Sequence, residues 1–594
     1  MPTSFRYSLL FVLLLASCVS AAQDVEATVN RLKNLKEQQL NITGGINLTS
    51  QFYDAVGIAD RRDNFQWGAR ANLNFSFLGI NAPFSFVFSE ANQNFGLPSY
   101  TFAGISPRYK WATLHAGDRS MSFSRYTMGG ISFRGVGLTL EPGKFHVSGF
   151  YGKLNRALAN DLNALGDLNG FYQRNGYGLR MGYGGKSTSV FANFFAADDQ
   201  ENEDLPPVTE LGPVFGLQNN KVISLEGRQR IGKRLSVFGE LAHSAFNGNN
   251  RATALAPEDE TFGNTLLGLF NPTEETQTGQ AYQIGAAYNQ TKYGLQLRYE
   301  RITRGFRTLG ALFFNKDSEN ITLGFNRNFL ENKLTVFVNG GLERTNLDAE
   351  EQESTNRIIG ALNLNYRPDD KWMLSSSYSN FRNDTKLRAR TNLLAPVDSI
   401  FLAQVTQNAN VMVLRQLGTK DSPSSLRLML MRQLANNIVN DEVNQNANSQ
   451  VTVASLAYTA GNPDAGLQWN TGLSYNTTRI GTINNNNFAP TLGINKNFLN
   501  NALATHLQSA LSLSTQNGDN SRIFNLSTGA TYRLANSHRL GLRATYLNRF
   551  GSAVTARNFR ELYGSLTYGY NFGGSIGRKE PLPVAAPSTP TKKR

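Results

Sequence analysis

The chain has 594 residues, with 58 Lys and Arg against 44 Asp and Glu, a formal net charge of +14, and a single Cys. One Cys excludes a scaffold stapled by disulfides, and 11% aromatic with 40% hydrophobic residues argues against disorder. No apolar run reaches the roughly 18 residues of a membrane-spanning helix, which excludes a polytopic helical membrane protein. The 54 Gly and 38 Phe instead suit many strands and turns.

The N-terminus carries a targeting signal. Arg6 precedes an apolar run at residues 9–16, and small residues follow. This order predicts a secretory signal peptide over residues 1–21. Two processing patterns remain open. The tripeptide Val-Ser-Ala before residue 22 fits a signal-peptidase site, whereas a lipoprotein box ending at Cys18 would lipidate that cysteine.

From about residue 38 to residue 572, apolar and polar side chains alternate in runs of about ten residues separated by turns. In residues 69–77, Ala, Leu and Phe at the odd positions alternate with Arg70 and small polar residues at the even ones. Successive side chains of a strand point to opposite faces, so the pattern predicts strands with one apolar face. Soluble sandwiches also alternate, but their strands are shorter.

Short turns and long polar loops follow each other along this region. The short turns are expected at 79–82, 116–119, 141–144, 184–186, 232–234, 289–292, 328–332, 368–371, 418–423, 461–464, 495–501 and 535–538. The clearest long loops are 54–64, 91–106, 154–171, 198–218, 246–277, 304–319, 345–355, 381–400 and 436–448. This asymmetry is typical of a transmembrane β-barrel, whose closure pairs every backbone group in lipid.

The sequence therefore predicts an all-β fold, a single transmembrane antiparallel up-and-down β-barrel of about 26 strands (24–26), with short periplasmic turns and long extracellular loops. The expected division is a signal peptide at 1–21, a periplasmic lead-in at 22–37, the barrel at 38–572, and a basic, Pro-rich periplasmic tail at 573–594. The lead-in is too short for the globular plug of a TonB-dependent transporter.

Charge is distributed unevenly. Three of the long loops hold 15 of the 44 acids, so the remainder has 29 acids against 58 basic residues. An Arg facing lipid at mid-membrane costs roughly 2–4 kcal/mol, so the charged strand residues should face the lumen. The lumen-facing candidates are Arg70, Arg228, Arg230, Glu240, Arg298, Glu300, Arg367, Arg427 and Arg543. Either they make an anion-favouring pore, or Arg–Glu pairs solvate and brace the wall.

A lumen this wide would breach the permeability barrier if it were left open. In residues 154–171, four Leu recur at helical spacing, and residues 246–277 are a second apolar segment. Each segment is expected either to fold inward and narrow the lumen or to lie across the outer surface.

No catalytic chemistry is evident. The five His are scattered without ligand spacing, which argues against a metal site, and Gly-rich residues 130–137 do not open a helix as a phosphate loop would. His146 and Ser148 share a strand face but are expected roughly 6–7 Å apart, with no third group to orient the His. We therefore expect no enzyme, no cofactor and no catalytic, cofactor-binding or metal residue. Nucleic acid is also disfavoured, because the basic residues alternate along strands.

Three segments resemble recurring stretches of large outer-membrane barrel proteins of Bacteroidota-type bacteria. They are residues 104–157, beginning GISPRYKWATLHAGDRS, residues 305–347, beginning GFRTLGALFFNKD, and residues 355–381, TNRIIGALNLNYRPDDKWMLSSSYSNF. The resemblance implies an integral outer-membrane location and a barrel of largely uncharacterised function, with no site residues to transfer. Phe572 matches the usual final-strand aromatic residue, but a tail of 22 residues follows it.

The expected function is a porin-like pore or channel for polar solutes, anion-preferring and constricted by inward-folded loops. The alternative is a non-enzymatic barrel subunit of an outer-membrane secretion, gliding or assembly complex. The expected partners are outer-membrane lipid, lipopolysaccharide, and a periplasmic or membrane partner protein.

Overall fold

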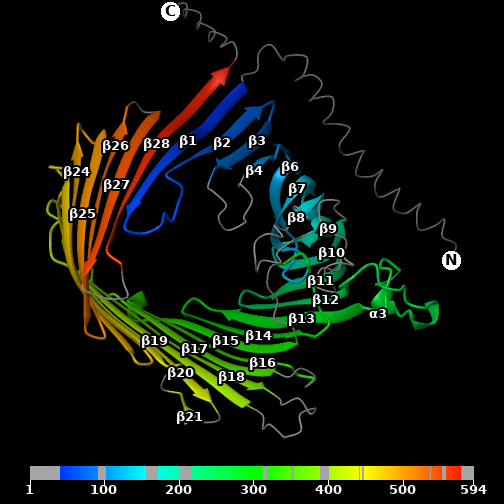
Figure 1. The fold of residues 1–594 in the computed structure, drawn as a ribbon. Helices are drawn as coiled ribbons and strands as arrows, with labels where there is room; N and C mark the ends of the chain where they lie inside the picture. Colours follow the sequence, from blue (N-terminus) through cyan, green and yellow to red (C-terminus); the bar gives the residue numbers. More distant parts are fainter. Residues whose placement is uncertain are drawn as a thin grey trace, which may run out of the picture.

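The computed structural model describes residues 40–90, 102–155, 172–200, 217–266, 268–311, 317–348, 353–387, 400–439, 442–444, 447–534, 537–551 and 557–576. They form one antiparallel sheet that closes on itself, because β1 (Leu40–Val56) pairs with β28 (Phe559–Ile576) from Leu40↔Ile576 to Val56↔Arg560. Figure 1 shows this ring of strands around a central space.

The strands of the first half are β2 (Phe65–Phe77), β3 (Ile80–Ser89), β4 (Phe102–Ile105), β5 (Arg108–Tyr109), β6 (Ala112–Ser122), β7 (Gly129–Leu140), β8 (Phe145–Asn155), β9 (Gln173–Gly184), β10 (Thr188–Gln200), β11 (Asn219–Ile231), β12 (Leu235–Asn247), β13 (Thr276–Asn289) and β14 (Tyr293–Ile302). Those of the second half are β15 (Ser318–Phe329), β16 (Leu334–Thr345), β17 (Glu353–Tyr366), β18 (Trp372–Leu387), β19 (Ile400–Gln416), β20 (Ser424–Val439), β21 (Glu442–Val443), β22 (Ser449–Asn462), β23 (Leu467–Ile480), β24 (Ile483–Phe498), β25 (Leu503–Gln516), β26 (Asp519–Arg533) and β27 (His538–Gly551).

Short helical turns lie between some of these strands: η3 (Pro257–Asp259), α3 (Phe262–Thr265) and η4 (Leu330–Asn332). Within the described residues, no helix is long and apolar enough to span a membrane.

The described strands fill 26 positions in the closed sheet. β4 and β5 together occupy the single position between β3 and β6, and β21 is a two-residue extension beside β20. The predicted all-β antiparallel barrel of about 26 strands is therefore confirmed. β28 runs to Ile576, four residues past the expected end of the barrel at 572.

One expected turn is wrong. Residues 116–119 lie inside β6, and the chain reverses instead at Lys110-Trp111, where Lys110 has a φ of 50°. The Ala-Gly-Asp sequence suggested a turn, but Gly117 adopts a φ of 88° within the strand. A Cβ there would lie 2.3 Å from the carbonyl oxygen of Ala103, so the glycine allows β4 to approach β6 closely.

Loop length distinguishes the two rims less clearly toward the C-terminus. β23 and β24 are joined by Gly481-Thr482, and β25 and β26 by Asn517-Gly518, on the rim that carries long loops elsewhere. Asn517 and Gly518 both have positive φ, of 49° and 96°, as two-residue hairpin turns require.

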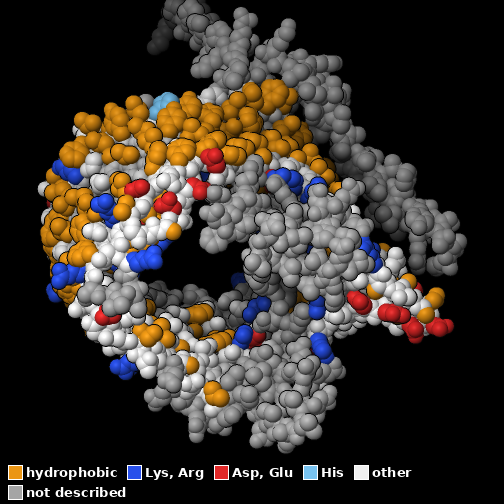
Figure 2. Space-filling model, viewed as in Figure 1, with side chains coloured by type: hydrophobic (Ala, Val, Ile, Leu, Met, Phe, Trp, Pro, Cys, Tyr) orange, Lys and Arg blue, Asp and Glu red, His pale blue; other side chains and the backbone are white. Residues whose placement is uncertain are grey.

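Most of the outer face of the barrel is apolar and exposed. Leu542, Leu225 and Ile284 are 60%, 59% and 58% exposed, and Figure 2 shows hydrophobic side chains as a broad band around the outside. Aromatic pairs lie toward both ends of this face, with Tyr288 near Tyr293 and Tyr282 near Tyr299. Such a band with aromatic girdles is the usual exterior of a membrane barrel.

Candidate functional site: the lumen wall and two inward loops

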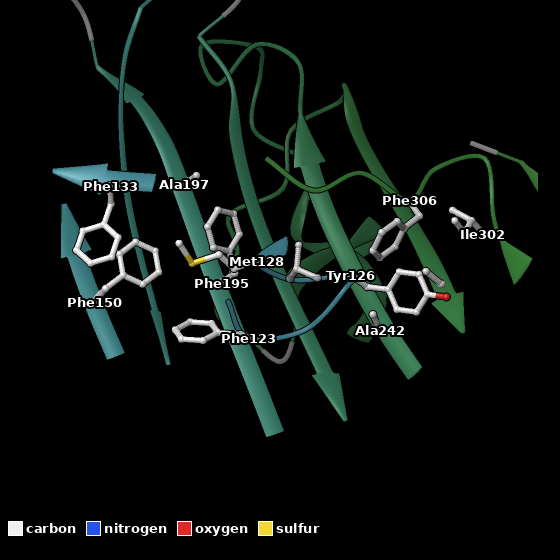
Figure 3. Close-up of a cluster of buried hydrophobic side chains, with 12 residues drawn as sticks. Phe123, Tyr126, Met128, Phe133, Phe150, Phe195, Ala197, Ala242, Ile302 and Phe306 are labelled. Carbon is white, nitrogen blue, oxygen red and sulfur yellow. The ribbon is translucent and has the colours of Figure 1, made fainter. Parts of the chain in front are cut away.

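The largest buried cluster lies inside the barrel, on one side of the lumen only, against β7–β14 (Figure 3). A short loop between β6 and β7, residues 123–128, contributes Phe123, Tyr126 and Met128 to this cluster. The wall accommodates the loop at Gly178 of β9, where a Cβ would lie 2.5 Å from the Phe123 ring. Apolar burial therefore holds this loop inside the barrel.

A second loop, residues 303–311 between β14 and β15, packs beside the first. The ring of Phe306 meets that of Tyr126 edge to face, with the centroids 6.0 Å apart. Thr308 Oγ1 donates to the carbonyl of Thr127 at 2.8 Å. Gly279 of β13 lets the second loop lie flat on the wall, because a Cβ there would come within 2.0 Å of the Phe306 nitrogen.

Polar side chains of the wall satisfy the backbone of the second loop. The Asn220 amide accepts a hydrogen bond from the Leu309 nitrogen at 3.0 Å and donates to the Arg307 carbonyl at 3.1 Å. Ser244 accepts from the Arg307 nitrogen at 3.0 Å. The Arg307 guanidinium lies 4.8 Å from the centre of the Phe246 ring. The loop is thus fixed by specific bonds as well as by burial.

Glu300 connects the first loop electrostatically to the wall. Tyr126 donates its hydroxyl to Glu300 Oε1 at 2.6 Å, and Arg125 Nη2 lies 3.0 Å from the same oxygen. The Glu300 side chain is 5% exposed, whereas that of Arg125 is 48% exposed. Burial and the bond to Glu300 raise the pKa of the Tyr126 phenol, which therefore stays protonated as a donor.

A second charged pair lies deeper in the same region. Arg180 Nη2 is 2.6 Å from Glu226 Oε1, and Arg180 also donates to the carbonyl of Phe123. Glu240, 5% exposed, accepts a long hydrogen bond of 3.4 Å from Gln283. Of the sequence-predicted residues, Glu240 and Glu300 therefore belong to this site, where acids anchor loops and pair with arginines.

The other strand candidates lie on the inner face but apart from this cluster. Arg70, Arg228, Arg230, Arg298, Arg427 and Arg543 each alternate with residues of the apolar outer face. Within the described part of the chain, none of the six forms an ion pair. Arg367 differs, because it lies in the turn after β17, where its nitrogen donates to the Lys333 carbonyl at 2.7 Å.

Sequence reasoning missed the two inward loops. The turn expected at 116–119 divides β6, so the sequence pattern does not indicate that a loop follows at residues 123–128. The available signal is three aromatic side chains in these two loops, those of Phe123, Tyr126 and Phe306.

The two segments expected to fill the lumen have different outcomes. Residues 156–171 lie outside the described residues. The segment 246–277 folds over the outer surface, the other alternative considered: Leu266 and Phe270 pack on Ala245 near Ile223, and Lys221 donates to the Leu269 carbonyl at 2.5 Å. Figure 1 shows α3 projecting outside the ring of strands.

A serine–histidine–glutamate arrangement corrects one expectation. Ser148 Oγ lies 2.8 Å from His146 Nε2, and His146 Nδ1 lies 3.3 Å from Glu141 Oε1. The expectation that the hydroxyl is out of reach and that no third group orients the ring is wrong, because the imidazole leans along the strand. Ser148 is nevertheless only 4% exposed, and its strand is paired on both sides with β7 and β9.

No group of three or more His, Cys, Asp and Glu among the described residues is placed to hold a metal ion.

No protein-family description and no curated protein matches this chain. Solved structures with a similar fold include the P pilus usher (PapC) translocation pore, at a TM-score of 0.36 and 11% identity, covering 90% of this chain and 100% of that one. The FrpB iron transporter from Neisseria meningitidis gives 0.34 and 11%, covering 89% and 82%. BauA, the ferric preacinetobactin receptor from Acinetobacter baumannii, gives 0.37 and 10%, covering 89% and 80%.

Proposed function

We propose that this chain is an integral outer-membrane barrel that acts as a pore for polar solutes and prefers anions. The exposed apolar outer band supports a lipid environment, since water would not solvate it favourably. The observation that carries the pore proposal is the inner wall, where arginines on β2, β11, β14, β20 and β27 face the central space and form no ion pair within the described residues. Among them, Arg228 has Glu226 as an electrostatic neighbour. Figure 2 shows Lys and Arg side chains along the described part of the border of the opening.

The two inward loops narrow this opening from one side. Their anchors are buried, whereas the Arg125 side chain is half exposed beside them. Because Glu300 neutralises Arg125 at this point, the anion preference rests on the arginines of the wall and not on the inward loops.

The test is conductance of the refolded full chain in planar bilayers under a salt gradient. We expect open channels whose reversal potential has the sign of a pore that is more permeable to anions than to cations. The preference should shrink between 0.1 M and 1 M salt, because the screening length falls from about 10 Å to about 3 Å. A folded, inserted barrel without conductance would contradict the pore.

The alternative, a non-enzymatic subunit of a secretion, gliding or assembly complex, has one supporting observation. The segment between β12 and β13 is structured on the outer face and presents Glu258, Asp259 and Glu260 at an exposed tip. Removing residues 256–265 should release a membrane partner during co-purification if the barrel works as such a subunit.

A further inference from the structure

The inner wall of β26 and β27 carries like charges in direct opposition. Arg533 and Arg539 are register partners, so their side chains leave the wall on the same face. Arg543 follows on that face of β27, four residues beyond Arg539. Like charges directly opposite each other destabilise a strand pair. All three side chains are exposed, and none forms an ion pair with a described residue.

The glycines between these arginines have no side chain of their own, so side chains of the neighbouring strands lie directly over their backbone. Gly529 is the register partner of Arg543, and Gly541 separates Arg539 from Arg543 along β27. A Cβ at Gly541 would lie 2.4 Å from Thr567 Oγ1, and one at Gly529 would lie 2.3 Å from His506 Cε1. The result is a backbone floor surrounded by guanidinium, imidazole and hydroxyl groups. We call Arg533, Arg539, Arg543 and His506, with this floor, the basic basin.

The basin continues onto the strands that close the barrel. Gly569 of β28 is opposite Arg539, and Asn47 of β1 is opposite both Gly569 and Arg70. Beside Arg70 is a cavity of about 430 Å³, whose lining includes Asn47, Thr49, Gln51 and Gln66. Amides and hydroxyls therefore extend the donor-rich surface without adding negative charge.

The acids of this part of the wall lie toward the other rim, where Asp519 begins β26 and two further acids, Glu561 and Asp63, are engaged by neighbours. Glu561 accepts a hydrogen bond from the Tyr53 hydroxyl at 2.6 Å and lies 3.5 Å from Arg61. Asp63 lies beyond β2 and contacts Gln66 at 3.3 Å. Both lie at the extracellular ends of their strands, whereas Arg533 and Arg539 lie at the opposite ends of theirs.

We propose that the basic basin binds a solute carrying two or more negative charges on phosphate groups, on its way through the lumen. Guanidinium groups bind phosphate with paired, charge-assisted hydrogen bonds, and a multivalent anion relieves the repulsion between Arg533 and Arg539. The inference deepens the proposed pore function and rests on it for the route of the solute.

Tripolyphosphate is the probe, and it is added to the full chain. Its block of channel current is measured in bilayers, and its equilibrium binding is measured by calorimetry on the barrel in detergent. The double variant R533Q/R539Q should weaken both the block of current and the binding of tripolyphosphate at least tenfold. Replacing Arg539 by Lys instead of Gln should recover only part of this loss. The matched control is Arg367→Gln, which removes an arginine from the turn after β17, on the same rim of the barrel, and should change neither the block nor the binding.

Each outcome is decisive for the basin. Binding that survives R533Q/R539Q, or that falls equally with R367Q, overturns the site in favour of diffuse attraction. A conducting channel that does not bind tripolyphosphate overturns the basin while the pore stands. Calorimetric binding that depends on the two arginines, in a barrel that does not conduct, supports the basin and refutes the pore. Heat-modifiable gel migration verifies that each variant is folded.

Discussion

The geometry of single side chains decides whether the inner wall of the barrel can catalyse a reaction. Ser148, His146 and Glu141 have the order of a nucleophile, a base and an orienting acid. A hydrolase also needs donors aimed at the developing oxyanion and a nucleophile that substrate can reach. Here the serine is buried, and the strand on which it lies is paired on both sides. We interpret the trio as a structural network.

Ser148 should therefore not react with a serine-directed fluorophosphonate. The expected result is equal, background labelling of the native barrel and of S148A, measured by mass spectrometry. Labelling of the native chain that disappears in S148A would show a reactive nucleophile and would contradict our view that the chain is not an enzyme.

Glu300 is the residue whose removal should free the first inward loop. Glu300→Ala leaves the Tyr126 hydroxyl and Arg125 without their acceptor. The unsatisfied, buried Tyr126 hydroxyl costs roughly 1–3 kcal/mol, whereas the half-exposed Arg125 remains solvated. Single-channel conductance should rise and the thermal midpoint should fall. R298Q, two residues earlier on the same inner face and without an ion pair among the described residues, should leave the thermal midpoint unchanged.

At the scale of elements, the site depends on strands that lack side chains where loops cross them. A Cβ at Gly178 of β9 would lie 2.5 Å from the Phe123 ring, and one at Gly279 of β13 would lie 2.0 Å from the Phe306 nitrogen. Gly310, in the second loop, likewise lets that loop approach the Thr127 carbonyl oxygen of the first. Two inward loops, separated by eight strands in the chain, are locked together by these contacts and by the hydrogen bond between Thr308 and Thr127. Their shared anchoring predicts that they move as a unit.

Gly279→Ala tests this coupling. The added methyl group meets the backbone of Phe306, which cannot give way as a flexible side chain would. We expect displacement of residues 303–311, larger conductance, and proteolytic cleavage within that loop. Gly324→Ala is the control, since its Cβ finds its nearest neighbour only at 3.9 Å. Equal conductance in the two variants would show that the second loop does not constrict the lumen.

For the molecule as a whole, one face of the sheet is suited to lipid and the other to water, so a closed ring of strands can be stable without a hydrophobic core. The apolar side chains need no core, so their high exposure is the expected state of a membrane barrel. The polar side chains point into a lumen where arginines outnumber acids, and the closure between β1 and β28 removes the sheet edges that would otherwise aggregate.

A charge placed on each face separates the two environments. Leu542→Arg puts a cation on the 60% exposed outer position and should cost roughly 2–4 kcal/mol in a bilayer. Thr545→Arg, three residues further along the same strand on the inner face, should cost much less. Urea unfolding from lipid vesicles measures both. Equal costs would mean that the apolar face is not covered by lipid.

The sequence by itself determined the class of fold and the approximate number of strands, because period-two alternation and turn residues are local signals. It also indicated which arginines alternate with apolar residues, as at Arg70 and Arg543. Only the tertiary structure decided which loops enter the lumen, since that depends on glycines such as Gly279 and Gly178 lying opposite aromatic residues far away in the chain. The pairing of Arg533 with Arg539 likewise follows from strand register, which alternation alone leaves undetermined because a shift of two residues preserves every face.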